Sequence, residues 1–362
     1  MGRHLEMDRV LFVTVILLVF FGLVMVFSAS AVTAERSQGT SYYYLGRQAA
    51  WATCGLLGMI WLMQRDYQRF RHPAVAFGFL GLAVIGLAAA LLWDRTANTH
   101  RFLRLGPLSL QPSEFAKLAL VVFLAYFLEA RSAAIREWRT WGPAAAVLAL
   151  LAGLVLLGRD LGTAFILVIL GAVIFWAAGL PGRYFAVGLG VLAPLAALAV
   201  LLEPYRIERL LTFWEPWRDP QGRGFQIIQS MIAVGTGGFT GAGLMASKQK
   251  LYYLPAAHTD FIFAVISEEL GLAGAAAVLA AYGVILWRGM QAGLKAQNRF
   301  GAYLAVGLTA MLVCQAWINI SVVLALLPTK GMPLPFVGYG GSSLVAALWG
   351  AGMLLSVSQR EA

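Results

Sequence analysis

The chain has 362 residues, of which 60% are hydrophobic and only 12% are charged. Soluble domains carry about 25% charged residues, so this composition indicates a membrane protein. The apolar runs are unbroken and as long as helices, which excludes an outer-membrane barrel. The net charge is +10. Positive charge beside membrane helices sets topology and attracts anionic lipids, so it indicates membrane lipids, and no nucleic acid, as partners.

The first segments set the domain boundary. Residues 1–6 lack apolar character, and we interpret them as an expression remnant before a single transmembrane domain, residues 7–362. The first apolar run, residues 10–32, is long enough to cross a bilayer and is followed by no plain cleavage pattern. We therefore expect a retained helix, not a signal peptide.

The apolar runs predict an all-α polytopic fold of about ten transmembrane helices. Three runs are shorter than a lipid-facing helix, and we expect their helices to extend into flanking polar residues such as Glu114 and Lys117. Residues 202–260 form one long loop between predicted helices 7 and 8, with amphipathic stretches that suit short interfacial helices. The runs are 10–32, 49–63, 74–92, 115–128, 143–157, 163–180, 184–202, 261–287, 301–327 and 343–355.

Orientation follows from Lys and Arg in the short loops. These residues are more numerous on the side of the N-terminus, which places both termini in the cytoplasm and the long loop outside. The prediction is a multi-pass protein of the bacterial cytoplasmic membrane with an extracytoplasmic loop.

The usual catalytic motifs for nucleotide, metal and serine chemistry are absent. Polar residues gather instead near the predicted outer face. Glu114 and Lys117, at i and i+3 after Pro112, either cap and solubilise a helix end or line a buried polar cavity. Asp160 lies in a polar break between two apolar runs, where a tight turn is the simpler interpretation.

The long loop ends in His258-Thr259-Asp260, where an aqueous segment meets an apolar helix. Partial desolvation would raise the pKa of Asp260 toward the range of a proton acceptor, but an aspartate at this place could equally cap the helix. Glu268 and Glu269 then stand inside the apolar run, where burial of a charge indicates a partnered or ligand-lined face. The segment 327–343, rich in Pro and Gly, predicts a structured re-entrant or rim loop.

The ordered series of these motifs closely resembles the SEDS family of bacterial polytopic membrane proteins, which comprises RodA, FtsW and SpoVE. The matching segments are Gln111-Pro112-Ser113-Glu114 with Lys117, Asp160-Leu161-Gly162-Thr163, Phe213-Trp214 with Pro216-Trp217 and Asp219-Pro220, Gly224-Phe225-Gln226 with Gln229-Ser230, Gln249-Lys250, His258-Thr259-Asp260-Phe261-Ile262-Phe263 with Glu268-Glu269-Leu270-Gly271, and Pro335-Phe336 with Tyr339-Gly340-Gly341-Ser342-Ser343. Residues 332–336 lean toward RodA, whereas residues 329–331 are more like FtsW, so elongation and rod shape are favoured over division.

The resemblance implies a glycosyltransferase that polymerises lipid II into glycan strands outside the cytoplasmic membrane. It also implies a class B penicillin-binding protein as transpeptidase partner, and polyprenyl-linked glycan as substrate and product. The essential carboxylate of the family corresponds to Asp260, and its polar cavity residues correspond to Glu114 and Lys117.

Sugar transfer from a diphosphate needs a base at the acceptor hydroxyl and cations or N–H groups at the leaving group. Our hypothesis makes Asp260 the base and places Arg101, Lys248 or Lys250 near the diphosphate, while Asp160, His258 and Ser342 complete the predicted site. No cofactor is certain; a divalent cation could share the diphosphate role, but the sequence shows no ligand set for a metal. Two other functions stay open, a flippase for the lipid-linked precursor and a scaffold without enzymatic activity.

Overall fold

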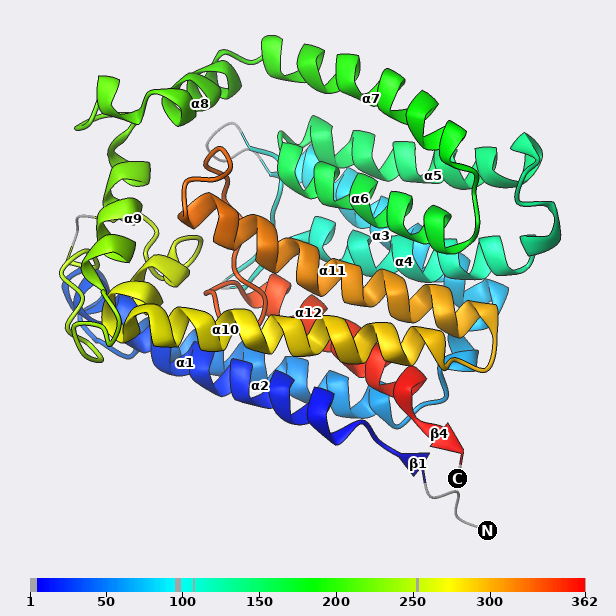
Figure 1. Ribbon diagram of the computed structural model, residues 1–362, viewed down its shortest axis with the longest axis horizontal. Coiled ribbons are helices and arrows are strands. Elements are labelled where there is room, and N and C mark those ends of the chain that lie inside the picture. The colour runs from blue at the N-terminus through cyan, green and yellow to red at the C-terminus, as the bar shows by residue number, and fades with distance from the viewer. Residues whose placement is uncertain (1–4, 95–98, 107, 252–253, 362) are drawn as a thin grey trace.

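The computed structural model describes residues 5–94, 99–106, 108–251 and 254–361, and these residues form a bundle of long helices (Figure 1). Residues 1–4 of the predicted remnant and Tyr252 and Tyr253 lie outside the described residues. The long helices are α1 (Arg9–Gln38), α2 (Tyr43–Met63), α3 (Pro73–Trp93), α4 (Pro112–Glu129), α5 (Trp138–Leu157), α6 (Leu161–Ala177), α7 (Gly182–Leu201), α10 (Ile262–Leu294), α11 (Arg299–Val323) and α12 (Gly341–Ser358).

Short elements join these helices. Two helices occupy the long loop, α8 (Pro204–Trp214) and α9 (Phe225–Thr236), as its amphipathic stretches predict. The single-turn helices are η1 (Tyr67–Arg71), η2 (Ser132–Ala134) and η3 (Pro216–Arg218), and the strands are β1 (Leu5–Glu6), β2 (Leu103–Leu105), β3 (Leu108–Leu110) and β4 (Arg360–Glu361). Strands β2 and β3 form an antiparallel pair that leads into α4.

Each predicted apolar run coincides with one long helix, so the polytopic all-α fold is confirmed. Within the described residues, seven helices are long and apolar enough to cross a membrane without further argument, and α2, α4 and α6 are shorter or more polar. The run 115–128 becomes α4, which starts at Pro112 and therefore contains Glu114 and Lys117. Both side chains are buried, so they face protein and not lipid.

Helix starts follow from local capping. The Asp8 carboxylate accepts from Leu11 N at 3.0 Å and begins α1, and the Asn298 side chain accepts from Gly301 N at 2.8 Å and begins α11. Asp160 caps α6 in the same way. Asp260 caps nothing: the residue before α10 is Phe261, and no side chain caps that helix. The capping alternative for Asp260 is therefore wrong.

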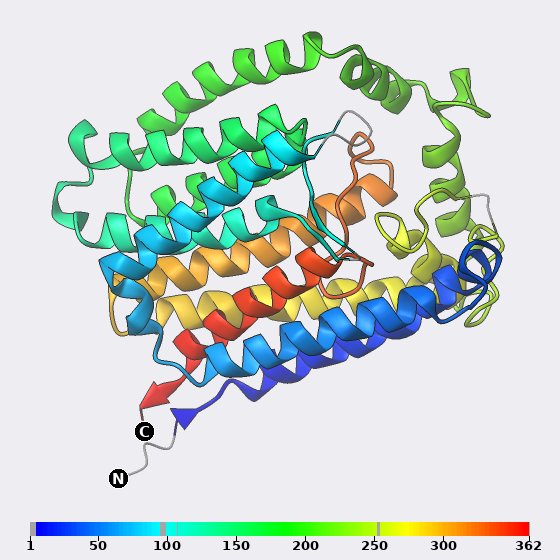
Figure 2. The ribbon, with the colours of Figure 1, turned by 180° about the vertical axis from the view of Figure 1, so that it is seen from behind.

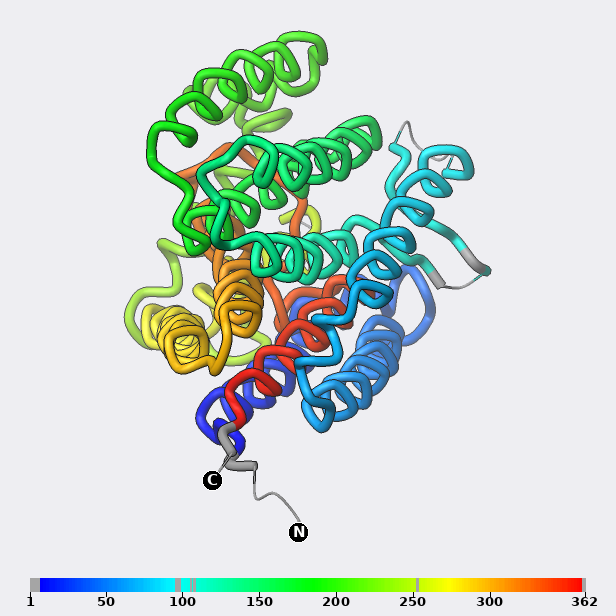
Figure 3. Tube along the Cα trace, turned by 90° about the vertical axis from the view of Figure 1, so that its right-hand side faces the viewer, coloured from blue at the N-terminus to red at the C-terminus, as the bar shows by residue number. Residues whose placement is uncertain are grey.

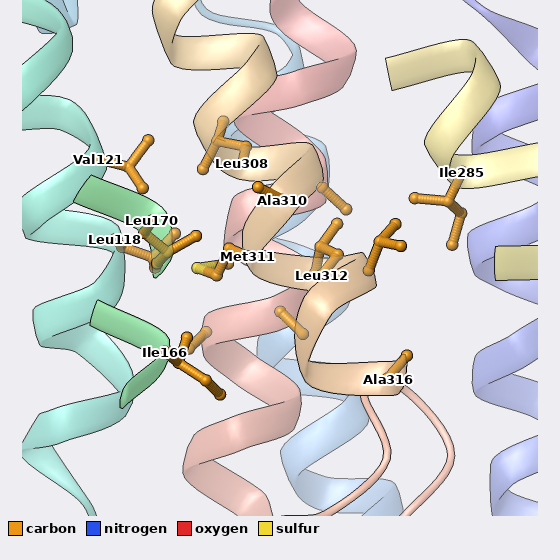
Figure 4. Close-up of a cluster of buried hydrophobic side chains, with 14 of the residues drawn as sticks. Leu118, Val121, Ile166, Leu170, Ile285, Leu308, Ala310, Met311, Leu312 and Ala316 are labelled. Carbon is orange, nitrogen blue, oxygen red and sulfur yellow. The ribbon is translucent and has the colours of Figure 1, made fainter. Parts of the chain in front are cut away.

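Helix α11 forms the centre of the bundle and packs against α4, α6, α10 and α12. Figure 4 shows Leu308 and Met311 of α11 beside Leu118 of α4 and Leu170 of α6, all completely or almost completely buried. Helix α12 is also almost wholly buried, and it packs closely along α2 (Figure 2). This middle layer of the bundle is apolar, which leaves the polar residues to its ends.

Helix α7 differs from the other long helices because none of its residues is buried. Its principal helix contact is with α8, and it lies along the outer edge of the bundle (Figures 1 and 3). An apolar helix with every face exposed is suited to lipid contact on all sides.

Helix α10 is broken at Gly271, whose φ of 64° and ψ of −161° are not helical. The glycine-rich segment 237–243 supplies the hydrogen bonds that the break removes: Leu272 N donates to Gly238 O at 2.8 Å, and Ala242 N donates to Glu268 O at 2.9 Å. Glycine-rich loops can also bind a ligand through their backbone, but here the glycines let the loop backbone approach the backbone of α10.

Both termini lie at one end of the bundle, where β1 and β4 pair antiparallel. The prediction that the two ends share one side of the membrane agrees with this arrangement. Which side faces the cytoplasm stays a prediction from the charge distribution.

Close packing at Gly22 provides a test of the fold. A Cβ at this position would lie 2.5 Å from Phe336 O and 2.7 Å from Val337 Cα, whereas a Cβ at Gly81 meets nothing within 4 Å. Gly22→Ala should therefore lower the melting temperature in detergent, because overpacking costs about 1–3 kcal/mol. Gly81→Ala should leave it unchanged or raise it slightly. Equal shifts for the two variants would contradict the packing of α1 against residues 336–337.

Candidate functional site

The candidate site lies at the end of the bundle opposite the termini, where four loops meet. Their described residues are 99–106 and 108–111, 158–160, 237–251 and 254–261, and 324–340. The last of them is a re-entrant segment between α11 and α12 with Phe336 in the left-handed region, at φ 67°. Asn319 of α11 holds the backbone of this segment, because its Nδ2 donates to Met332 O at 2.6 Å. The same Nδ2 donates to Asp260 O, at the end of the long loop, at 2.8 Å.

Asp260 lies between the long loop and α10, beside the re-entrant segment. A Cβ built on Gly331 would lie 3.0 Å from Asp260 Oδ2, so a glycine leaves room for the carboxylate. No hydrogen-bond donor among the described residues reaches this carboxylate. Burial raises the pKa of Asp260 to about 6, and the nearby Arg209 guanidinium opposes this shift. The Asp260 carboxylate is therefore ionised at neutral pH, and no hydrogen bond from the described residues offsets its charge.

A cavity of about 380 Å³ adjoins Asp260 through Gly331, and its largely apolar wall carries a cluster of cationic side chains; we call it the cationic cavity. Five basic side chains line it against one acidic side chain, Asp160. The basic residues come from four separate segments and are Arg101, Arg159, Arg206, Arg209 and Lys330. Such convergence of positive charge is suited to an anionic group with several oxygens.

The cations are held in place by backbone carbonyls. Arg209 Nη1 donates to Thr329 O at 2.8 Å, and Arg206 Nη1 donates to Ala199 O at 2.6 Å. Arg101 donates from Nε to Gly158 O at 3.3 Å. Carbonyls fix the orientation of a guanidinium without neutralising its charge, and each group has further N–H donors for a ligand.

Lys330 stands over Gly162, and a Cβ on that glycine would overlap the lysine side chain. Burial lowers the pKa of Lys330 to about 8, against the attraction of Asp160. The Asp160 carboxylate itself accepts from Thr163 N at 3.1 Å, from Thr163 Oγ1 at 2.8 Å and from Gln111 Nε2 at 3.3 Å. Asp160 thus joins the start of α6 to the start of α4 and faces the cationic cavity.

Glu114 and Lys117 form a buried ion pair at 2.9 Å. Lys117 Nζ also donates to Gln315 Oε1, and Gln315 Nε2 donates to Pro333 O at 3.1 Å. The pair is therefore part of a network that ties α4 and α11 to the re-entrant segment. Burial of both partners excludes an exposed, solubilising cap, but neither side chain lines the cationic cavity.

Ser342 joins two other parts of the site. Its hydroxyl accepts from Gln111 N at 2.9 Å and donates to Ser109 O at 3.3 Å. It therefore fixes the start of α4 against the start of α12 and lines no part of the cationic cavity.

Lys250 lies in a different network, with the two glutamates of α10. Lys250 Nζ pairs with Glu269 Oε1 at 2.7 Å, and Ser28 Oγ donates to the same carboxylate at 2.7 Å. Glu268 accepts from Lys248 N at 2.8 Å, while the Lys248 side chain is exposed. The glutamates are thus partnered, as their burial predicts. Neither Lys248 nor Lys250 lines the cationic cavity.

His258 packs in an aromatic cluster, with ring centroids 4.6 Å from Tyr44 and 5.6 Å from Tyr339. Desolvation lowers the pKa of His258 to about 4, so the imidazole is neutral at physiological pH.

Metal ligands are not grouped in the described ranges: no set of three or more His, Cys, Asp or Glu side chains is placed to hold an ion.

Comparisons with known proteins identify the family. Residues 8–362 match the model of the FtsW, RodA and SpoVE family of cell cycle proteins. The chain belongs to this family, the SEDS family. An FtsW of Geobacter metallireducens, named a probable peptidoglycan glycosyltransferase, is 40% identical over 98% of this chain and 95% of its own. Stage V sporulation protein E of Bacillus subtilis is 40% identical over 97% of both chains.

Solved structures confirm the fold of this SEDS chain. One comes from work on structural coordination of polymerization and crosslinking by a peptidoglycan synthase complex; it has a TM-score of 0.80, 33% identity and 98% coverage of both chains. The rod shape determining protein RodA of Thermus thermophilus has a TM-score of 0.72 and 28% identity over 98% of this chain and 97% of its own. FtsW and SpoVE relatives thus stand nearer in sequence than RodA, so the expected lean toward elongation is not supported.

Sequence reasoning missed four of the five cations: Arg159, Arg206, Arg209 and Lys330. Arg206 and Arg209 stand at i and i+3 on the amphipathic helix α8, a spacing that places both on one face. Lys330 is a lone cation in a loop rich in Pro and Gly, where a charge near lipid calls for a partner. The sequence contains these signals, but it does not predict that α8 lies over the re-entrant segment.

The Lys250–Glu269 pair provides a test of the site's support. Lys250→Met should destabilise the protein strongly, because loss of one partner of a buried pair costs about 3–5 kcal/mol. Lys248→Met is the matched control, since only its backbone N–H is used. Melting curves in detergent should show a large loss for the first variant and little change for the second; similar curves would contradict the buried pairing.

Proposed function

We propose that this chain is a peptidoglycan glycosyltransferase that polymerises lipid II into glycan strands. Membership of the SEDS family and relatives named as glycosyltransferases support the reaction class. The observation that carries the proposal is a partly buried carboxylate, Asp260, which accepts no hydrogen bond from the described residues and lies at the edge of the cationic cavity. A base beside a set of cations is what sugar transfer from a diphosphate requires.

Asp260 acts as the general base in this proposal. With a pKa of about 6 it is ionised at neutral pH, yet basic enough to accept a proton from a sugar hydroxyl as that oxygen attacks. The oxygen forms the new glycosidic bond at the anomeric carbon of the donor with inversion. The bond to the diphosphate breaks, and its electron pair leaves with the diphosphate.

The leaving diphosphate gains negative charge as the bond breaks, and the cationic cavity is placed to stabilise it. Arg209 acts electrostatically on Asp260, and Arg101 and Lys330 also line the cavity. Since backbone carbonyls already orient Arg101 and Arg209, little reorganisation of these two groups is needed during the reaction. The Glu114–Lys117 pair supports the cavity by holding the re-entrant segment through Gln315.

The cellular setting of this proposal is the outer face of the bacterial cytoplasmic membrane, with both termini inside. A class B penicillin-binding protein is the expected transpeptidase partner, in keeping with the solved synthase complex in which polymerization and crosslinking are coordinated. The nearer FtsW and SpoVE relatives favour a role in division or sporulation over one in elongation.

A flippase or a scaffold fits the structure less well. A transport path needs polar groups through the middle of the bilayer, but Leu118, Leu170, Leu308 and Met311 fill the core between α4, α6 and α11 (Figure 4). A scaffold gives no reason to keep an unneutralised carboxylate next to five cations.

Asp260→Asn tests the base directly. The variant keeps the size of the side chain and removes its charge, so polymer formation from lipid II by purified protein should fall at least 100-fold, as the loss of a general base does. The melting temperature should be kept or raised, because a buried charge is removed. Wild-type turnover by this variant would refute the role of Asp260.

The pH dependence gives a second test. Activity requires Asp260 to be ionised and Lys330 to be protonated, so the rate should rise as pH increases through about 6 and fall as it passes about 8. Lys330→Arg keeps its charge above pH 8 and should extend activity to higher pH, with a melting curve as the control for folding. An unchanged alkaline limb in a folded Lys330→Arg variant would contradict the role of Lys330.

A further inference from the structure

The re-entrant segment runs beside the three residues that end the long loop. Tyr339 N donates to His258 O at 2.9 Å. A Cβ on Gly338 would lie 2.9 Å from Thr259 O, and one on Gly331 would lie 3.0 Å from Asp260 Oδ2. His258 and Asp260 therefore contact opposite ends of the segment 331–339, which gives the stretch 258–260 two different sides.

One side is the cationic cavity, which Gly331 and Lys330 line. The other side is aromatic and consists of Tyr44, His258 and Tyr339, which we call the aromatic trio. The ring centroids of Tyr44 and Tyr339 lie 5.3 Å apart, and His258 lies 4.6 Å from Tyr44 and 5.6 Å from Tyr339. All three side chains are only partly buried, so their rings keep an accessible face.

The aromatic trio is held rigidly by α2. Gln48 Nε2 donates to Gly338 O at 3.1 Å, and its Oε1 accepts from Gly340 N at 3.4 Å, so one buried amide fixes the backbone on both sides of Tyr339. Arg47 places positive charge beside the rings, where it interacts with Tyr339 and Tyr44. The result is a preformed aromatic surface with a cation at its edge.

We propose that the aromatic trio binds the sugar of the acceptor substrate, while the cationic cavity binds the diphosphate of the donor. The inference rests on the proposed function, and it assigns the acceptor and the donor to different sides of Asp260. The C–H face of a pyranose packs on aromatic rings, and the polar edges of Tyr side chains can hydrogen-bond its hydroxyls. A neutral imidazole provides a face of the same kind, and the low pKa of His258 keeps it neutral.

This arrangement places each substrate where its chemistry is needed. The acceptor hydroxyl that loses its proton lies on one side of the base, and the diphosphate that gains charge lies on the other. The two substrates would compete for one place if both bound in the cationic cavity.

Two analogues of lipid II separate the roles. An analogue with a methylene group in place of the anomeric oxygen cannot be cleaved and serves only as acceptor. An analogue that lacks the acceptor hydroxyl serves only as donor. Wild-type protein, purified with its partner, is assayed with the two analogues together, and the concentration of each is varied in turn.

The test variants are Tyr44→Leu and Tyr339→Leu, with Tyr44→Phe and Tyr339→Phe to restore the ring. Tyr42→Leu is the matched control, because Tyr42 lies next to the trio in sequence but stacks on Phe27. We expect the Leu variants to raise the KM for the acceptor analogue about tenfold, with kcat and the KM for the donor analogue unchanged, which corresponds to a loss of about 1.4 kcal/mol. The Phe variants should recover most of the affinity.

Equal effects on donor and acceptor, or wild-type kinetics in the Leu variants, would overturn the inference and leave the proposed function intact. A lowered melting temperature with both KM values unchanged would show that the trio is only structural, which also overturns it. Absence of any product with wild-type protein would instead refute the proposed function.

Discussion

The structure depends on one constraint: polar groups placed inside an apolar bundle must find partners within the protein. The re-entrant segment 324–340 meets this constraint and organises the site in doing so. Asn319 and Gln315 of α11 hold its carbonyls, Gln48 of α2 holds residues 338–340, and Tyr282 donates to Pro335 O. Three helices thus fix one irregular segment, and Lys330 and Gly331 are placed beside Asp260 as a result.

Against this background Asp260 is the exception. Glu114, Asp160, Glu268 and Glu269 all have ion-pair or hydrogen-bond partners, whereas the Asp260 carboxylate has no donor among the described residues. A partly buried charge without a hydrogen bond lowers stability, so its retention indicates a use other than folding. The nearby Arg209 guanidinium favours the ionised carboxylate without donating a hydrogen bond to it.

The sequence predicted most of the fold because apolar runs of helical length are a strong signal. Every predicted run became one long helix, and the polar extension of α4 followed from the cost of exposing Glu114 and Lys117 to lipid. It also predicted that Glu268 and Glu269 have partners. It could not predict the break at Gly271 or the partner of Lys250, because both depend on contacts between residues far apart in the chain. The same reason hid Arg206 and Arg209, whose position over the re-entrant segment is set by how α7 and α8 fold back.

The central claim is that this bundle performs sugar transfer at Asp260. The most direct measurement is polymer formation from lipid II by the purified wild-type protein and its transpeptidase partner in detergent, where no membrane separates two compartments. The account predicts glycan strands attached to a polyprenyl diphosphate, together with released polyprenyl diphosphate. Lipid II recovered unchanged by a folded, partner-bound protein would contradict the account.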